Sequence, residues 1–376
     1  MQQGEAFVSD IWTHTGYAQQ VLFGGGVVRE LPNVLRQLGV RRVLLVTTEG
    51  RAQSADGATV QQLLGRASVS TFASVQSHVP APLVQEAVRQ ARRDAIDAVV
   101  SFGGGSCADL AKAVCWFTEQ AQGTPGATWA DRPVVPHVSI PTTYSGAELT
   151  PFFGMTDPAT RQKGGAGGPT IAPLAAVYDP ELTLSTPARV SAETGMNALA
   201  HCVEAAWSPT RTPEAEAIAL AGARRIVDAL PLVVASPDDI GARTEMLVAA
   251  ALAGRCLQNA GMGVHHGLAQ LVGGRTGMSH GLANAVILSH AVRFNAQEVA
   301  ADVRRIGEAI GAPDDPAGSI AALTAQLGLP TRLSEAGMTE EDLDAVVASS
   351  GSNSSVRSNP RTVMEADARA ILLAAM

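Results

Sequence analysis

The chain has 376 residues, of which 46% are hydrophobic and 16% charged, and its net charge at pH 7 is −8. This length exceeds the roughly 250–300 residues at which a single core stops growing, so we expect two domains. The acidic balance excludes the basic surface of a nucleic-acid-binding protein, and no apolar run approaches the ~20 residues that span a bilayer. Glu5 and Asp10, with no basic n-region, do not fit a signal peptide, so we expect a cytoplasmic protein.

Short apolar runs alternate with helical patterns over roughly the first 155 residues, which is typical of βαβ units around a parallel sheet. The predicted strands of this half are 42–48, 98–102 and 135–141. The predicted helices are 27–38 and 82–94. Strand signals disappear after about residue 179, and Ala- and Leu-rich helices are predicted over 187–208, 213–235, 240–259, 281–294, 299–310 and 365–375. The Gly- and Pro-rich segment 156–173 is predicted to be a long loop.

Three glycines directly follow the predicted strand 98–102: Gly103, Gly104 and Gly105. They allow a ligand to approach the backbone closely, and the helix that starts here offers free N–H groups and a positive dipole end to a diphosphate. Ser106 is predicted to cap that helix, and Asp109 and Lys112 complete the pattern G-G-G-S-x-x-D-x-x-K. A plain strand-to-helix turn is the alternative interpretation.

Small hydroxyl side chains follow the third predicted strand, in the run P-T-T-Y-S-G-A-E over residues 141–148. The carboxyl end of a parallel strand is where ligands bind in open α/β sheets, although an ordinary Ser/Thr turn would look the same. The four residues of interest are Thr142, Thr143, Tyr144 and Ser145. Thr48 and Glu49 follow the first predicted strand, near where a ribose would lie.

Polar residues recur at helical spacing in the second half of the chain. Asn197 and His201 are four residues apart, as are His266 and Gln270, and His280 opens a third helical stretch. Residues four apart share a helix face, so these five side chains are predicted to form one polar site. The neighbouring residue at 265 must point elsewhere. For any single histidine, an ordinary core or surface position is the alternative.

In this order and spacing the motifs resemble the iron-containing alcohol dehydrogenase superfamily, from about Phe23 to the C-terminus. Further features are similar to its maleylacetate reductase branch: His78-Val79-Pro80, Gly195-Met196-Asn197, His265-His266 and Asn359-Pro360-Arg361. The resemblance implies a dehydroquinate synthase-like fold, with a Rossmann-like α/β dinucleotide-binding domain over residues 1–157 and an all-helical catalytic domain over residues 158–376. It also implies a cleft between the domains and a cytoplasmic homodimer.

The implied reaction is hydride transfer from NADH or NADPH to maleylacetate or a related unsaturated oxo acid or enone, in aromatic-compound breakdown. Cofactor binding is expected at Gly103, Gly104, Gly105, Ser106, Asp109, Thr142, Thr143, Ser145, Thr48 and Glu49. Catalytic roles are expected for Tyr144, Asn197, His201, His266, Gln270 and His280. The metal-dependent relatives often have Asp at the position of Thr48, so both nicotinamide cofactors stay open.

Departures from the family pattern refine these expectations. Metal-binding members have Asp where this chain has Asn197, and losing the only anionic ligand predicts that no metal is needed. A site of His201, His266 and His280 can still hold Zn or Fe. Gln270 replaces a usual histidine and cannot donate a proton near neutral pH.

The predicted loop also departs from the maleylacetate reductase branch. By resemblance, arginines are usual at the positions of Gly167 and Thr170, and Arg is well suited to gripping a carboxylate at two points. Their loss predicts a less anionic substrate, unless cations from other segments compensate. The candidates are Arg161, Lys163, Arg275, Arg357 and Arg361.

Three other functions fit parts of the pattern. One is a metal-dependent alcohol or aldehyde dehydrogenase, and another is a non-redox lyase or cyclase that resembles dehydroquinate synthase and recycles NAD⁺ internally. The third is a catalytically silent binding protein on the same scaffold. The four cysteines form no C-x-x-C pair and are predicted to be buried free thiols.

Overall fold

The computed structural model describes residues 11–123, 133–160 and 162–376. The start of the chain, where no signal peptide is expected, therefore lies largely outside the described residues. Two compact units are formed: Gly16–Thr186 is one, and Pro187–Met376 with the segment up to Thr15 is the other. The predicted division after residue 157 differs from this one, because later strands pair within the first unit.

A six-stranded sheet lies at the centre of the first unit, and all its neighbouring strands are parallel. Its order is β1-β8-β5-β4-β2-β3. The strands are β1 (Gln20–Phe23), β2 (Val43–Thr47), β3 (Ser68–Phe72), β4 (Ala98–Gly103), β5 (His137–Pro141) and β8 (Ala175–Tyr178). The three predicted strands are confirmed as β2, β4 and β5, whose carboxyl ends meet at one edge of the sheet.

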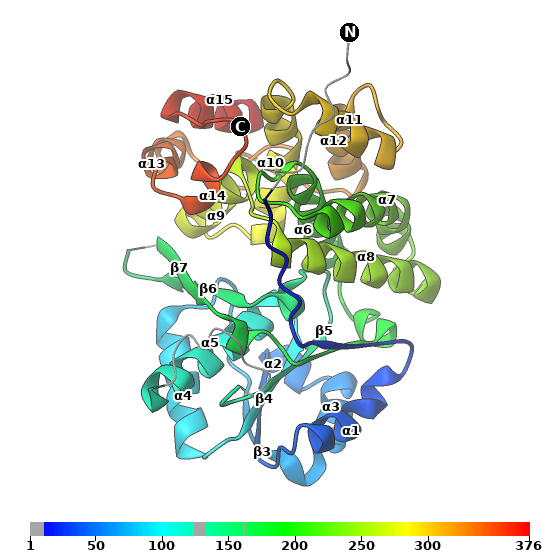
Figure 1. Cartoon of the computed structure of the whole chain (residues 1–376), viewed down its shortest axis with the longest axis vertical. Coiled ribbons are helices and arrows are strands. Elements are labelled where there is room, and N and C mark those ends of the chain that lie inside the picture. Colours follow the sequence, from blue (N-terminus) through cyan, green and yellow to red (C-terminus); the bar gives the residue numbers. More distant parts are fainter. Residues whose placement is uncertain (1–10, 124–132, 161) are drawn as a thin grey trace. The chain divides into compact units, whose positions relative to one another are not determined.

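Helices cover both faces of this sheet, as Figure 1 shows. Alternate residues of a strand point to opposite faces, so Leu44 and Val46 pack in one core while Val43 and Leu45 pack in the other. The helices are α1 (Leu31–Gln37), α2 (Glu49–Ala52), α3 (Ala55–Leu64), α4 (Ala81–Arg93) and α5 (Gly105–Gln122). Short 3-10 turns are η1 (Val27–Glu30), η2 (Gly65–Ala67), η3 (Ala147–Leu149), η4 (Pro169–Ile171) and η5 (Pro180–Thr183).

The segment predicted to be a loop over 156–173 is largely ordered into a hairpin, so that prediction is wrong. β6 (Phe152–Asp157) pairs antiparallel with β7 (Gln162–Gly167). The glycines that suggested a loop allow close pairing here: a Cβ on Gly165 would lie 2.1 Å from the carbonyl oxygen of Phe153. A glycine inside a strand marks such a close backbone approach as readily as it marks a turn.

The second unit is helical, as predicted, and its described residues from 187 onward contain no strand. Its helices are α6 (Ala188–Trp207), α7 (Pro213–Ala235), α8 (Ile240–Asn259), α9 (Val264–Thr276), α10 (His280–Asn295), α11 (Ala300–Ala309), α12 (Pro316–Gln326), α13 (Glu340–Ser350), α14 (Ser354–Arg357) and α15 (Glu365–Ala375). None of the described helices is both long enough and apolar enough to cross a membrane. The four cysteines are free and buried, as expected.

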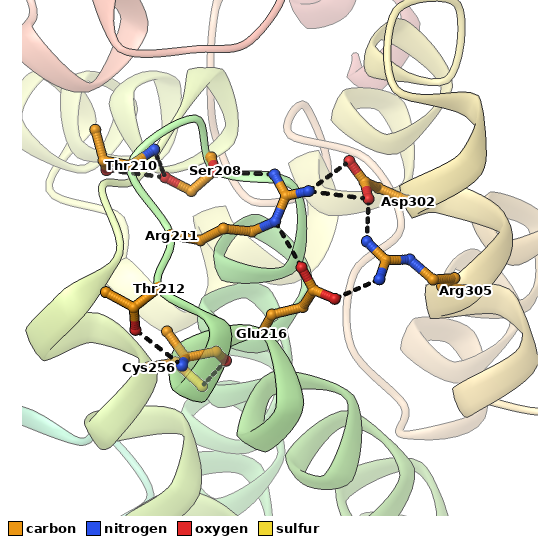
Figure 2. A network of polar contacts seen from close by, with 9 residues as sticks. Ser208, Thr210, Arg211, Thr212, Glu216, Cys256, Asp302 and Arg305 are labelled. Carbon is orange, nitrogen blue, oxygen red and sulfur yellow. Dashed lines mark hydrogen bonds and ion pairs between the residues drawn. The ribbon is translucent and has the colours of Figure 1, made fainter. Parts of the chain in front are cut away.

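A buried ionic network fixes the C-terminal end of α6 (Figure 2). Arg211 follows that helix, and its guanidinium donates to the carbonyl of Ser208, to Glu216 at the start of α7 and to Asp302 in α11. Arg305 pairs with both carboxylates and closes the network. The network ties the segment directly after α6 to α7 and α11, and α6 itself carries Asn197, His201 and Glu204, which are discussed below.

Candidate active site

The glycine turn after β4 is built for close approach. Gly103 has φ of 143°, a conformation that residues with a side chain rarely adopt. α5 starts at Gly105 with Gly104 as its N-cap, and no side chain caps it there. Ser106 lies inside the first turn, so its predicted role as the N-cap is wrong. The start of α5 therefore keeps backbone N–H groups available for an anion.

The hydroxyl-rich run after β5 packs directly against this turn. A Cβ on Gly104 would lie 3.1 Å from Cγ2 of Thr143, and one on Gly105 would lie 3.0 Å from Oγ of Ser145. The backbone N–H of Thr142 donates to the carbonyl of Gly103 across 2.9 Å. The structure therefore brings both predicted motifs into one cradle of backbone and small polar groups.

Three other predicted cofactor residues have structural partners. Thr48 caps α2 by accepting from the N–H of Arg51, and Glu49, the exposed first residue of that helix, accepts from the side-chain amide of Gln53. Asp109 accepts from the N–H of Gly154 and forms an ion pair with Lys112. Their proposed contacts with a cofactor stay predictions.

Lys112, the last residue of the glycine motif, has a fully buried side chain. Its ammonium group donates to the carbonyl oxygens of Ala147 and Phe152 and to the hydroxyl of Thr150. A buried ammonium needs such oxygens because its desolvation is costly. Lys112 thereby anchors the segment between the hydroxyl-rich run and the β6–β7 hairpin. Tyr144, which was expected to be catalytic, is fully buried.

Three histidines that the sequence singled out lie together in the helical unit. The rings of His201 on α6 and His266 on α9 are stacked, with centroids 4.7 Å apart, and the ring of His280 on α10 is 6.1 Å from that of His266. The predicted polar site is thus formed by three helices. Burial, followed by the neighbouring imidazoles, lowers the pKa of His201 well below its usual value, so this ring is neutral at pH 7.

The start of α10 explains how His280 comes close to α6. Ser279 caps α10 and also donates a 2.6 Å hydrogen bond to the carboxylate of Glu193, one turn before Asn197 on α6. A Cβ on Gly281 would lie 2.6 Å from the carbonyl oxygen of Glu193, so only glycine permits this approach. α10 therefore begins in direct contact with the helix that carries Asn197.

The two predicted amides have different surroundings. Asn197 is buried, and its Oδ1 accepts a 2.7 Å hydrogen bond from Nδ2 of Asn284. Gln270 is half-buried one turn after His266, and its Oε1 accepts from Nδ2 of Asn353 across 3.5 Å. Positions 197 and 270 both carry a neutral amide. The predicted residues of the site are therefore imidazoles and amides, and none of them is a carboxylate.

Glu204 supplies a carboxylate that the sequence analysis missed. It is fully buried on α6, seven residues after Asn197 and three after His201, and its Oε2 lies 2.6 Å from Nδ1 of His266. Burial alone would raise the pKa of this carboxyl, but its hydrogen bonds with His265 and His266 outweigh burial and hold the pKa well below its usual range. Glu204 is therefore an anion.

Glu204, His265 and His266 have ligand atoms within 4.8 Å of one another, so this group could hold a metal ion. It differs from the predicted set of His201, His266 and His280. Three imidazoles suit Zn²⁺ or Fe²⁺, but the fourth position of the predicted set is the neutral Asn197, which lowers the affinity of that set.

Sequence comparisons connect both units with known enzymes. A profile described as "Iron-containing alcohol dehydrogenase" matches residues 18–180, and one described as "Fe-containing alcohol dehydrogenase family, C-terminal" matches residues 191–376. Maleylacetate reductase of Burkholderia cepacia is 34% identical over 94% of each chain. Maleylacetate reductase 1 of Rhodococcus opacus is 34% identical over 98% of this chain and 97% of its own.

Solved structures give the same relationship. The crystal structure of maleylacetate reductase from Rhizobium sp. strain MTP-10005 has a TM-score of 0.85 and 31% identity, and the comparison covers 98% of each chain. The corresponding enzyme from Agrobacterium tumefaciens has a TM-score of 0.85 and 30% identity over the same share.

Proposed function

Because this chain belongs to the iron-containing alcohol dehydrogenase family, we propose that it reduces maleylacetate or a related unsaturated oxo acid or enone. It is an oxidoreductase that depends on NADH or NADPH. The observation that carries the substrate class is Asn197 beside three clustered histidines, in a chain similar to maleylacetate reductases over nearly its whole length. From the family we also expect a cytoplasmic homodimer, which light scattering of the purified protein tests.

The cofactor is proposed to bind at the glycine turn. A side chain on Gly104 or Gly105 would fill the cradle against Thr143 and Ser145, so the absence of side chains there fits a diphosphate. The N-terminus of α5 favours the negative charge of that group. Ser106, Asp109, Thr142, Thr48 and Glu49 are proposed to line the rest of the nucleotide site. When bound, the reduced nicotinamide supplies the hydride.

The helical unit is proposed to stabilise the charge that develops on the substrate. Hydride addition to an enone or ketone leaves negative charge on the substrate oxygen, and fixed hydrogen-bond donors lower the energy of that state. His201, His266 and His280 with Asn197 are the proposed groups, and catalytic roles are also proposed for Gln270 in the same unit and for Tyr144 in the sheet unit. Gln270 contributes hydrogen bonds and no proton, since an amide does not ionise near pH 7.

We propose that the reaction needs no metal. Asn197 is neutral, and Glu204, the buried carboxylate that the described residues place beside these histidines, already accepts from backbone N–H groups. The Glu204–His265–His266 group favours the competing function, a metal-dependent alcohol or aldehyde dehydrogenase. Activity that disappears on chelation and returns with Zn²⁺ or Fe²⁺ would establish that alternative.

The proposed substrate is less anionic than maleylacetate itself. Thr170 is buried and donates to Glu119, and Gly167 pairs with Phe152 in the hairpin, so neither position offers a positive charge. Three of the arginines named as substitutes are engaged elsewhere in the helical unit, and Arg161 lies outside the described residues. Arg275 pairs with Glu341 and Asp342, Arg357 donates to Gly351 and Ser352, and Arg361 donates to Phe294 and Gln297.

The test is an oxidation assay with NADH and NADPH against maleylacetate, a monocarboxylate analogue, a neutral enone and an aldehyde. We expect cofactor consumption with the first three and a kcat/KM for maleylacetate no higher than for the less charged analogues. A preference for maleylacetate of a hundredfold or more, about 2.7 kcal/mol, would contradict the substrate argument. Turnover of a substrate without net consumption of cofactor would instead indicate a lyase or cyclase.

A further inference from the structure

The start of α9 is capped by two side chains from distant parts of the chain. The N–H of Val264 donates to Oδ1 of Asn359, and those of His265 and His266 donate to the two carboxylate oxygens of Glu204. The N-terminal N–H groups of a helix have no partners within it, so these two residues satisfy the whole first turn. The helix dipole adds to the stabilisation of a carboxylate at this position.

Gly263 makes room for both caps. As the N-cap residue of α9 it has no side chain, and a Cβ there would lie 2.6 Å from Oδ1 of Asn359 and 2.9 Å from Oε1 of Glu204. The position at which helices usually carry Ser, Thr or Asp is thus occupied by groups from α6 and from the segment before α15. The carboxylate of Glu204 is therefore held in a fixed position against the first turn of α9, which carries His266.

Hydrogen-bond partners decide which nitrogen of His265 carries the proton. Its Nε2 lies 2.9 Å from the backbone carbonyl oxygen of Asn284, which can only accept. The proton of the neutral ring is therefore on Nε2, and Nδ1 has a lone pair. This Nδ1 lies 3.3 Å from Nδ1 of His266.

Hydrogen-bond partners also decide the position of the proton on His266, whose Nδ1 faces two acceptors. Its Nδ1 faces Oε2 of Glu204 at 2.6 Å and the lone pair of His265 Nδ1 at 3.3 Å. Both neighbours accept, so the proton belongs on Nδ1 of His266. In the neutral ring its Nε2, on the edge of the ring away from Glu204, then carries the lone pair.

We propose that Glu204 is a positioning residue, which holds His266 in the Nδ1–H tautomer and thereby presents a lone pair on Nε2 in the cluster with His201 and His280. Neutral His266 then accepts a hydrogen bond from a substrate hydroxyl or from a protonated neighbour, while Asn197 and the other rings donate. The tautomer of an imidazole is set in the same way wherever a carboxylate holds the opposite nitrogen. The role in catalysis rests on the proposed function, whereas the tautomer does not.

The test reads the tautomer directly, by two-dimensional NMR of protein labelled with ¹⁵N in its histidine rings. The signals of His266 are assigned by their loss in His266→Gln. In the unsubstituted protein we expect a protonated Nδ1 and an unprotonated Nε2 for His266. The opposite tautomer there would overturn the proposal, whatever any variant does.

Two variants separate positioning from mere support of the helix. Glu204→Met has a similar length but removes the acceptor from Nδ1, so we expect the Nε2–H form of His266 to appear and kcat to fall about 10- to 100-fold, with KM changed much less. Glu204→Asp should restore the tautomer in part. Asn359→Ala removes the other cap of α9 and should lower stability while His266 keeps its tautomer. An unchanged tautomer in a folded Glu204→Met protein would refute the positioning role.

The outcomes also distinguish this inference from the proposed function. If His266 has the expected tautomer and no enone or oxo acid is reduced, then the positioning role of Glu204 stands and the proposed substrate class fails. If reduction occurs and the tautomer is reversed, then the substrate class stands and the inference fails.

Discussion

Lys112 in the sheet unit and Glu204 in the helical unit are both fully buried ions, and each is surrounded by backbone groups of the opposite polarity. Lys112 gathers carbonyl oxygens from the segment before the hairpin, whereas Glu204 gathers N–H groups from the start of α9. The two ions differ in the side chain that each one contacts in addition to these backbone groups. Lys112 also pairs with Asp109, while Glu204 also holds an imidazole of the histidine cluster. A buried ion held by backbone groups thus stabilises the fold in the sheet unit, whereas in the helical unit it contacts a residue proposed to be catalytic.

The largest effect that this comparison predicts is on stability. Lys112→Met should lower the free energy of unfolding by about 3–5 kcal/mol, because it leaves Asp109 without its cation and the carbonyls of Ala147 and Phe152 without their donor. Urea unfolding measures this. Lys163→Met is the comparison variant, since Lys163 is the only other lysine, has an exposed surface and also lies near the charge of Asp109. Equal losses in the two variants would show that Lys112 anchors nothing.

A second prediction concerns a buried histidine that has no carboxylate beside it. His137 in β5 contacts Ser101, and burial, helped by Lys112, lowers its pKa to about 3. Below pH 6.5 the His137 ring is protonated in the unfolded chain but not in the folded chain. The free energy of unfolding therefore decreases by about 1.4 kcal/mol for each pH unit below 6.5. By pH 5 the loss is about 2 kcal/mol.

The variant His137→Gln removes this titration and keeps a polar group of similar size. Its stability, measured by urea unfolding between pH 7 and pH 5, should fall less steeply than that of the parent chain. Parallel pH profiles of the two proteins would show that His137 is protonated within the folded sheet.

The third prediction tests whether the sheet unit binds its ligand through backbone groups. Gly104→Val places a branched side chain against Thr143, so nucleotide affinity should fall at least tenfold, about 1.4 kcal/mol. Calorimetric titration with NADH measures the affinity. Gly351→Val is the control for added bulk, because nothing lies within 4 Å of a Cβ there and its φ is −63°. Full nucleotide affinity in a folded Gly104→Val protein would exclude this turn as the diphosphate site.

The smallest expected effect is that of metal removal. The carboxylate of Glu204 already accepts hydrogen bonds from two backbone N–H groups and from Nδ1 of His266, so activity should be unchanged after prolonged EDTA treatment and dialysis. The companion variant Asn197→Asp adds an anion beside the histidines and should bind Zn²⁺ more tightly than the parent chain, as measured by calorimetry. Activity that returns only with added metal would reverse this prediction.

The sequence predicted those parts of the fold whose signal is local. α7, α8 and α15 begin and end at the predicted residues, because their apolar spacing and flanking caps are local features. The β6–β7 hairpin was missed because a run of glycines carries no strand signal. The glycine-rich segment becomes a strand only because it pairs with β6. β1, β3 and β8 were missed as well: β1 and β8 have only four residues each, and β1 and β3 lie at the edges of the sheet.

The candidate site was predicted by residue type more readily than by contact. The histidines were found because rare polar residues at i, i+4 spacing stand out on apolar helices. Glu204 continues the row of Asn197 and His201 on α6, so a search for polar residues at i+7 would have found it. Its seat at the start of α9 depends on Gly263 and Asn359, which are far apart in sequence from α6, and no spacing within one helix predicts such a contact.

The contact of Gly104 and Gly105 with Thr143 and Ser145 has a consequence for protein engineering. Each motif fills the space that the other leaves, within a few tenths of an ångström. A chimera made from this chain and a relative therefore inherits a mismatched interface if its crossover falls between residues 105 and 142 and the two parents differ at these positions. Crossovers placed after residue 148 transfer the two motifs together, and we expect libraries built in that way to retain more folded members.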